Sequence, residues 1–174
     1  MKIFITNLGR YNEGYLVGKW VKLPVCEDVL DKVLKEIGID EYYEEYFITD
    51  YENEIIGIGD VISEYSSVQA LNELAQRIED LSDDEADKLG AVLEYEACRS
   101  VSEVLELLDK LDEFDLLTDV TDDEELGYYY AEEYCCIDIP EYIQPYFDYE
   151  KFGRDVRLQS CCLYTSYGFL LDNR

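Results

Sequence analysis

The strongest constraint on this chain is its charge: 42 Asp and Glu stand against 14 Lys and Arg, with no His, which gives a formal net charge of −28. The excess is concentrated, because residues 27–133 hold 35 acids and six bases, whereas residues 1–26 hold one acid and four bases. Like charges in a compact chain repel one another and destabilise it. A small domain needs a net charge of only about 2–8 for solubility. We therefore expect this excess to reflect either halophilic adaptation or a basic partner.

Several kinds of function are excluded by what the composition lacks. Without His, the chain has no Ser–His or Cys–His catalytic pair and no imidazole metal ligand. Its apolar runs are too short to span a membrane, and residues 1–6 lack the features of a signal peptide. The six Cys include the adjacent pairs Cys135-Cys136 and Cys161-Cys162 and form no CxxC motif. This pattern indicates reduced thiols that pack as small apolar groups, and it predicts a cytoplasmic protein.

The hydropathy pattern predicts an α+β fold that begins with a small α+β unit. Strands are expected at residues 1–6, 15–23 and 42–51, with turn signals at 7–9 and 13–14. Apolar residues follow helical spacing over residues 26–37, and Gly38 ends that helix. A length of 174 residues fits one ordinary domain or two to three very small ones. We therefore predict an N-terminal α+β domain over residues 1–62.

Two further segments complete the predicted organisation. Residues 63–111 contain three short amphipathic helices, opened by the Ser66-Ser67 pair, by the capping box of Ser82 and Glu85, and by Ser100. Residues 112–174 read as a strand at 114–120, a helix from Thr121 to residue 133, a short helix from residue 140, a turn-rich stretch at 149–155 and a hairpin at 158–171. These patterns predict a central helical domain over 63–111 and a C-terminal α+β domain over 112–174.

The many acids raise two other possibilities, a calcium-binding site and a catalytic pair of carboxylates. Among 42 acids, adjacent carboxylates give no evidence for a catalytic pair. An EF-hand frame from Asp122 places Glu124, Gly127 and Glu133 at positions 3, 6 and 12, but Leu126 at position 5 cannot coordinate. The chain also has no Gly-rich phosphate loop. We predict a non-enzymatic protein with no cofactor and no dedicated metal site.

The acid excess instead favours binding to a basic protein. An acidic surface repels nucleic acid and attracts cations or basic protein surfaces, so no direct nucleic-acid binding is expected. B-DNA carries one charge per about 1.7 Å, so 28 charges match roughly 48 Å of duplex. Matching the charge density of the duplex requires either that the acids gather on one side of the molecule or that the molecule is elongated.

Five stretches of the chain resemble one known family. They are residues 7–20 (NLGRYNEGYLVGKW), 41–52 (EYYEEYFITDYE), 128–133 (YYYAEE), 139–150 (IPEYIQPYFDYE) and 152–156 (FGRDV). In this order they resemble the ArdA-type antirestriction proteins, which are carried by conjugative plasmids and transposons. The resemblance covers essentially the whole chain.

The resemblance implies a DNA mimic that protects incoming mobile-element DNA. Such a protein is an elongated chain of three small domains whose acids follow a curved surface similar to bent B-DNA. It occupies the DNA-binding groove of type I restriction–modification enzymes, chiefly the methyltransferase core. We predict that the phosphates are represented by the following acids: Asp28, Asp31, Glu36, Glu41, Glu44, Glu45, Glu79, Asp80, Asp83, Asp84, Asp87, Glu106, Asp109, Asp112, Asp122, Asp123, Glu124 and Glu125.

The resemblance also implies a homodimer formed through the C-terminal domain. We place the interface around residues 114–120, at Phe114, Leu116, Leu117 and Val120, where an edge strand can pair with its symmetry mate. Two alternatives to restriction-enzyme inhibition remain open: an acidic divalent-cation-binding protein and a general sequestering module for basic DNA-binding proteins.

Overall fold

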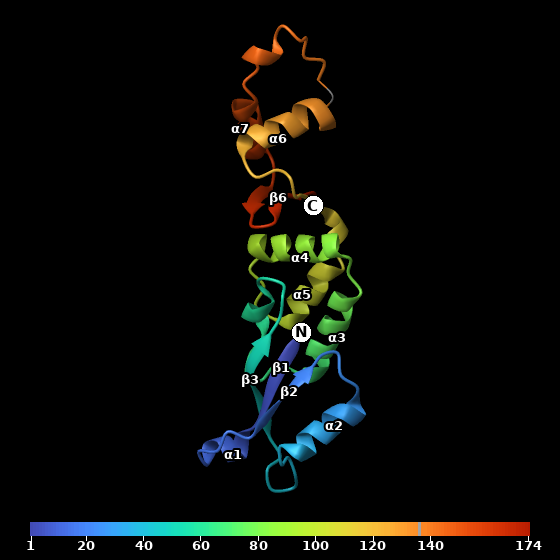
Figure 1. Cartoon of the computed structure of the whole chain (residues 1–174), viewed down its shortest axis with the longest axis vertical. Coiled ribbons are helices and arrows are strands. Elements are labelled where there is room, and N and C mark those ends of the chain that lie inside the picture. The colour runs from blue at the N-terminus through green and yellow to red at the C-terminus, as the bar shows by residue number, and fades with distance from the viewer. Residues whose placement is uncertain (136) are drawn as a thin grey trace. The chain divides into compact units, whose positions relative to one another are not determined.

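The computed structural model describes residues 1–135 and 137–174 (Figure 1). These residues form a mixed helix-and-strand fold with two antiparallel three-stranded sheets, which confirms the predicted class at that level. Contacts within the chain group it into a first unit, Met1–Ala86 with Ala97–Asp109, and a second unit, Asp87–Glu96 with Lys110–Arg174. The division into three domains at residues 62 and 111 stays a prediction.

The sheet of the first unit contains β1 (Lys2–Asn7), β2 (Gly18–Lys22) and β3 (Tyr46–Glu52) in the order β2-β1-β3 (Figure 1). Side chains alternate between the two faces of a strand. Ile3 and Ile5 of β1 are 0% exposed and lie on the face that contributes to the core. Phe4 lies between them in sequence and stands opposite Trp20 of β2 and Asp50 of β3. It therefore points to the other face of the sheet.

Two helices border this sheet, and one of them corrects a prediction. Residues 7–9 do not form a turn, because Leu8–Asn12 is the short helix α1 and the Asn7 carboxamide oxygen accepts the N–H of Arg10 at 2.9 Å. The second helix, α2 (Glu27–Glu36), confirms the predicted helix, and Gly38 follows it with φ at 79°. An asparagine directly before a helix is a common cap, so the turn signal at Asn7 was in fact a helix start.

The third strand starts four residues later than predicted. Asp40 accepts the backbone N–H groups of Tyr42 and Tyr43 at 2.8 and 2.9 Å, which holds this segment in a turn. The strand β3 therefore begins only at Tyr46. Side-chain bonds of this kind compete with strand pairing.

The remaining helices of the first unit follow the predicted start signals. The 3-10 helix η1 spans Ile58–Val61, α3 spans Val68–Glu79 and α5 spans Val101–Leu108. The hydroxyls of Ser67 and Ser100 accept the N–H groups of Ala70 and Glu103. Leu71 and Leu74 of α3 are fully buried, and α3 packs against α5. These caps and apolar stripes confirm the predicted helices.

Helix α4 (Asp83–Tyr95) begins at the predicted capping box. The Ser82 N–H donates to the Glu85 carboxylate at 2.9 Å, and the Glu85 N–H donates to the Ser82 hydroxyl at 3.3 Å. Each side chain thus satisfies a backbone donor of the other residue, which is the pattern that the sequence predicted.

The sheet of the second unit contains β4 (Phe114–Leu117), β5 (Cys162–Thr165) and β6 (Gly168–Asp172) in the order β4-β6-β5. The 3-10 helix η2 (Leu111–Glu113) precedes β4, which ends three residues earlier than predicted. Strands β5 and β6 confirm the predicted hairpin, with Gly168 at its turn at a φ of 131°. The hairpin begins at Cys162 rather than at residue 158, because α7 (Tyr149–Gln159) takes up the first residues of the predicted range. Phe169 of β6 forms a buried cluster with Val120 and Leu126.

The helices of this unit correct a second prediction. Helix α6 (Asp123–Tyr128) continues into the π-helix η3 (Tyr129–Tyr134). The stretch at 149–155, predicted to be rich in turns, belongs to α7 (Tyr149–Gln159), which Asp148 caps by accepting the Lys151 N–H at 3.0 Å. Gly153, in the middle of this stretch, lies where α7 packs closely against α6.

Two smaller predictions also change. No regular helix begins at Pro140; a turn leads instead to the 3-10 helix η4 (Gln144–Tyr146), and Tyr142 is 74% exposed. Cys26, Cys135 and Cys161 are exposed thiols rather than packed apolar groups. Cys136 lies outside the described residues.

Candidate functional site: an acidic surface

Nearly all of the acidic side chains reach solvent. Of the 42 Asp and Glu residues, all are exposed except Glu96, Asp123 and Asp172, which are half-buried. Each of these three is paired with an arginine: Asp123 with Arg157, and both Glu96 and Asp172 with Arg174. Carboxylates that lose solvent need such partners, because burial of an unpaired charge is costly. The fold therefore neutralises the acids that it shields and leaves the others facing water.

The predicted phosphate surrogates fall into groups along the chain. Seventeen of the eighteen are exposed, and Asp123 is the exception. In the first unit they lie on α2 (Asp28, Asp31, Glu36), in the turn before β3 (Glu41, Glu44, Glu45), at the end of α3 (Glu79, Asp80), at the start of α4 (Asp83, Asp84) and on or after α5 (Glu106, Asp109). In the second unit they lie on α4 (Asp87), on η2 (Asp112) and at the start of α6 (Asp122, Asp123, Glu124, Glu125).

A few of the exposed surrogates have basic partners within the chain. Glu36 pairs with Lys19, Asp109 pairs with Arg77 at 2.7 Å, and Glu79 lies 3.7 Å from Lys22. Exposed pairs of this kind contribute little to stability and exchange readily with water or with another cation. With 14 bases for 42 acids, most carboxylates have no basic residue available to them inside the molecule.

Helix starts fix several of these carboxylates in place. At α6, the Asp122 carboxylate accepts the N–H groups of Glu124 and Glu125 at 3.0 and 2.9 Å. The Glu125 carboxylate in turn accepts the Thr121 N–H and hydroxyl, both at 2.7 Å. Negative charge near a helix N-terminus is favoured by the helix dipole. The same residues therefore cap the helix and present negative charge to solvent.

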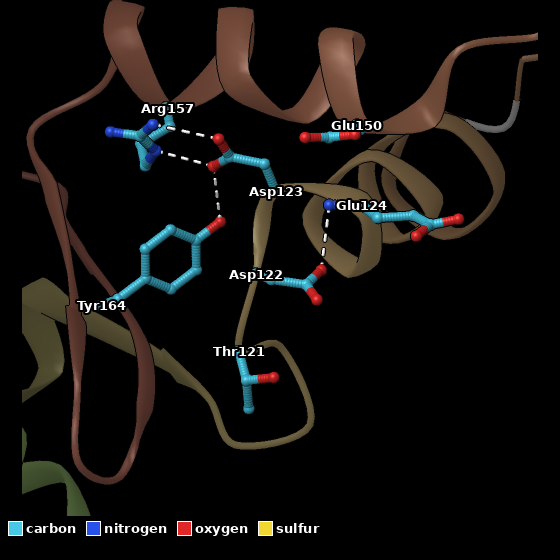
Figure 2. Close-up of a pocket in the computed structure, with 7 residues that line it drawn as sticks. All are labelled: Thr121, Asp122, Asp123, Glu124, Glu150, Arg157 and Tyr164. Carbon is cyan, nitrogen blue, oxygen red and sulfur yellow. Dashed lines mark hydrogen bonds and ion pairs between the residues drawn. The ribbon is translucent and has the colours of Figure 1, made fainter.

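This helix start lines an acidic cavity of about 690 Å³ in the second unit (Figure 2). Asp122, Asp123 and Glu124 line it from the start of α6, and Glu150 lines it from α7. Figure 2 shows Asp123 lying between Arg157 and Tyr164, whereas Glu124 points away from that pair. The cavity therefore has one neutralised carboxylate and several that remain accessible.

Asp123 is held by three hydrogen bonds. Arg157 donates to both of its carboxylate oxygens, at 2.7 and 3.0 Å, and the Tyr164 hydroxyl donates at 2.9 Å. The bonds from Arg157, reinforced by Tyr164, hold the pKa of Asp123 below its usual value despite its partial burial. Burial and the bond to Asp123 raise the pKa of Tyr164. Asp123 is thus half-buried and held within its own unit, whereas the other seventeen predicted surrogates are exposed.

Glu150 is a member of this cavity that the sequence did not single out. It was missed because residues 149–155 were read as turns. Read as a helix, the same residues place Glu150 and Arg157 seven apart, on one face of α7. Helical spacing across Gly153 was the signal that would have found it.

The residues predicted at the dimer interface differ in exposure. Phe114 is 0% exposed and Val120 is 6% exposed, so both belong to the core of their own chain. Leu116 and Leu117 are half-buried on β4, which is an edge strand of its sheet. They line a cavity of about 380 Å³ together with Tyr128 and Tyr129. Of the four residues predicted at the interface, Leu116 and Leu117 are therefore the two whose apolar side chains reach the surface.

The EF-hand frame is not a loop in the structure, because Asp122 caps α6 and the residues after it are helical as far as Tyr134. Among the described residues, no cluster of three or more acidic or Cys side chains has an arrangement that could hold a metal ion. Within residues 1–135 and 137–174, no helix combines the length and the apolar character needed to span a membrane.

Comparison with known proteins agrees with the resemblance seen in the sequence. The family model described as Antirestriction protein (ArdA) matches residues 3–170. A search of curated proteins finds no match. The family match covers nearly the whole of the 174-residue chain and both of its units. The chain therefore belongs to the ArdA family of antirestriction proteins.

Proposed function

We propose that this protein inhibits type I restriction–modification enzymes by mimicking DNA. Membership of the family implies antirestriction function and an interaction with restriction–modification enzymes. In our proposal the acidic surface occupies the DNA-binding groove of the methyltransferase core and so protects incoming mobile-element DNA. The observation that carries this mechanism is the exposure of all but three of 42 acids on a folded scaffold.

Electrostatics supplies both the speed and the strength of this binding. A groove that binds DNA is lined with basic side chains, and complementary charge steers two surfaces together rapidly. Phosphate contacts dominate DNA affinity and make it strongly dependent on salt. Carboxylates that replace phosphates are expected to show the same dependence. The protein then competes with DNA for the same basic residues.

The folded scaffold adds preorganisation to this charge. Carboxylates at the starts of α4 and α6 are positioned by capping bonds, such as those of Glu85 and Asp122. Positions that are already ordered lose less conformational entropy on binding. A carboxylate on a protein also offers no phosphodiester bond to a nuclease.

We further propose a homodimer that pairs through β4 of the second unit. The argument is that β4 is an edge strand with half-buried Leu116 and Leu117 beside a cavity of about 380 Å³. An open strand edge is a ready template for pairing with a second copy. Two copies related by a two-fold axis would extend the acidic surface.

A competition assay tests the mechanism. A type I restriction enzyme is bound to a labelled DNA duplex, and the purified protein is titrated in at two salt concentrations. Near-stoichiometric displacement of DNA, with potency falling as salt rises, is the expected result. Retention of DNA at every ratio contradicts the proposal. Equal displacement of DNA from unrelated basic DNA-binding proteins would instead identify a general sequestering module.

A further inference from the structure

The outer face of the sheet in the first unit carries an aromatic cluster that the acidic-surface mechanism does not use. Phe4 of β1 and Trp20 of β2 are paired across the sheet, with ring centroids 5.3 Å apart in an edge-to-face arrangement. Tyr11 of α1 meets Phe47 of β3 in the same way at 5.1 Å. Trp20 and Tyr11 are 40% and 51% exposed, so the cluster is open to solvent.

These aromatic rings line a cavity of about 430 Å³ that also contains two carboxylates. Phe4, Tyr11, Trp20 and Phe47 form its aromatic part, and Asp50 and Glu64 form its acidic part. Asp50 of β3 stands directly opposite Phe4 in the strand register. The backbone carbonyl of Glu64 accepts the N–H of Ile48 at 2.8 Å, which ties its segment to β3.

The two carboxylates are available for a ligand. Asp50 accepts the backbone N–H of Tyr51 at 2.8 Å, and neither Asp50 nor Glu64 has a basic partner in the part of the chain that the structure describes. The nearby bases already have other partners. The four basic residues in the segment 1–26 each form an ion pair with another acid: Lys2–Glu52, Arg10–Glu13, Lys19–Glu36 and Lys22–Glu79.

This combination of groups matches the chemistry of an arginine side chain. A guanidinium stacks on aromatic faces, forms charge-assisted hydrogen bonds with carboxylates and is more weakly hydrated than an ammonium group. A phosphate or a carboxylate ligand would be repelled by Asp50 and Glu64. A purely apolar ligand would leave both carboxylates without a counter-charge.

We propose that this cavity binds an arginine side chain presented by a partner protein. The inference rests on the proposed function, in which that arginine belongs to the DNA-binding groove of the restriction–modification enzyme. When the protein displaces DNA, this arginine would exchange its contact with a DNA phosphate for the two carboxylates and the aromatic rings of the cavity. Contacts with the DNA backbone do not provide such aromatic stacking. The cavity thus adds a specific contact to the diffuse attraction of the acidic surface.

Trp20 gives a direct readout, because it is the single Trp of the chain. The probe is an end-capped peptide of alternating glycine and arginine, compared with a peptide in which lysine replaces each arginine. Both are titrated into the full-length protein at physiological salt while tryptophan emission is recorded. We expect a saturable change in emission, with an apparent Kd at least about threefold lower for the arginine peptide.

A matched pair of variants separates this cavity from general attraction to acids. Asp50→Asn with Glu64→Gln removes two charges from the cavity, and the control Asp60→Asn with Glu73→Gln removes two exposed charges of the same unit that lie outside the cavity and outside the predicted surrogates. The cavity variant should raise the Kd for the arginine peptide at least about fivefold, and the control by less than about twofold. Unchanged emission in the wild type, or equal weakening by both pairs, overturns the inference. If the double variant melts early, Glu64→Gln alone carries the test.

The competition assay distinguishes this inference from the proposed function. A wild-type protein that binds the arginine peptide at Trp20 but leaves DNA on the enzyme contradicts the proposed function and retains the arginine site. If the wild-type protein displaces DNA but the emission of Trp20 does not change on addition of the arginine peptide, the arginine site alone is overturned. If both hold, the cavity variant should inhibit less strongly than the control variant Asp60→Asn with Glu73→Gln.

Discussion

Gly153 of α7 lies so close to α6 that a Cβ atom added to it would stand 2.6 Å from the backbone nitrogen of Gly127 and 1.9 Å from the carbonyl oxygen of Asp123. In the reverse direction, a Cβ on Gly127 would stand 2.0 Å from the carbonyl oxygen of Tyr149. The two helices are therefore in backbone contact at this crossing. Neither glycine has a positive φ, so close packing rather than turn geometry accounts for both.

This crossing predicts a large cost for Gly153→Ala. The added methyl group meets backbone atoms that cannot move aside alone, and overpacking of this kind costs about 1–3 kcal/mol or more. We expect urea unfolding to show a loss at the upper end of that range. Leu158→Ala, on the exposed side of the same helix, serves as the control and should change stability by less than about 0.5 kcal/mol. Equal stability of the two variants would contradict the packing role of Gly153.

Asp123 should behave differently from the other predicted phosphate surrogates. Asp123→Asn removes charge from the hydrogen bonds with Arg157 and leaves that guanidinium half-buried beside Tyr164. We expect the free energy of unfolding to fall by about 1–2 kcal/mol, as measured by chemical denaturation. Asp155→Asn is the control, because Asp155 is exposed and lies 3.9 Å from Arg154. If the two variants are equally stable, the pairing of Asp123 has no structural importance.

The free energy of unfolding at acidic pH should depend on the ionisation of Asp172. Hydrogen bonds from Arg174 lower the pKa of Asp172 from 3.8 to about 2. A carboxyl whose pKa is lower in the folded state stabilises the fold at pH values above its unfolded pKa and loses that contribution as the pH falls through its folded pKa. The free energy of unfolding should therefore decrease by about 1–2 kcal/mol between pH 4 and pH 2 through this group.

The variant Asp172→Asn tests that assignment. It should be less stable than the wild type at pH 6 and should show a shallower loss between pH 4 and pH 2, because the titrating group is gone. Thermal unfolding followed by circular dichroism at several pH values measures both effects. Parallel pH profiles for the two proteins would assign the acid sensitivity to other carboxylates.

Inhibition should depend on clusters of acids rather than on any one acid. Replacing Asp84 by Asn is expected to raise the half-inhibitory concentration by less than about threefold in a restriction assay. Replacing Asp83, Asp84 and Asp87 together should raise it by about tenfold at low salt. Neutralising Asp138, Glu141 and Asp155, which lie outside the predicted surrogates, matches the charge change and should have the smaller effect. Loss of inhibition from Asp84→Asn alone, with the fold intact, would argue against diffuse mimicry.

The dimer proposal makes a prediction at the edge strand. A charge at Leu116 or Leu117 of β4, as in Leu116→Glu, should convert the protein to monomers in sedimentation velocity experiments. Leu163→Glu places the same charge on β5, the other edge strand of that sheet, and should leave the dimer intact. An unchanged dimer in Leu116→Glu would exclude this edge as the interface.

The sequence alone was sufficient to predict those features of the structure that depend on residues close together in the chain. Ser82 and Glu85 bond to each other across three positions, so their capping box and the helix after it could be predicted. The exposure of the acids was equally predictable, because charged groups stay in water unless they are paired. Family membership also followed from the sequence, and the match over residues 3–170 agrees with it.

Only the tertiary structure decided how distant residues modify this pattern. It paired Asp123 with Arg157, 34 residues later, and so removed one carboxylate from the exposed set. It showed that Gly153 allows a helix crossing rather than a turn, because its close neighbour Gly127 lies on another helix. It also brought Phe4, Trp20, Asp50 and Glu64 together from separate segments around one cavity. Local hydrogen bonds and solvation are set by residue type and spacing, whereas these contacts exist only after the chain has folded.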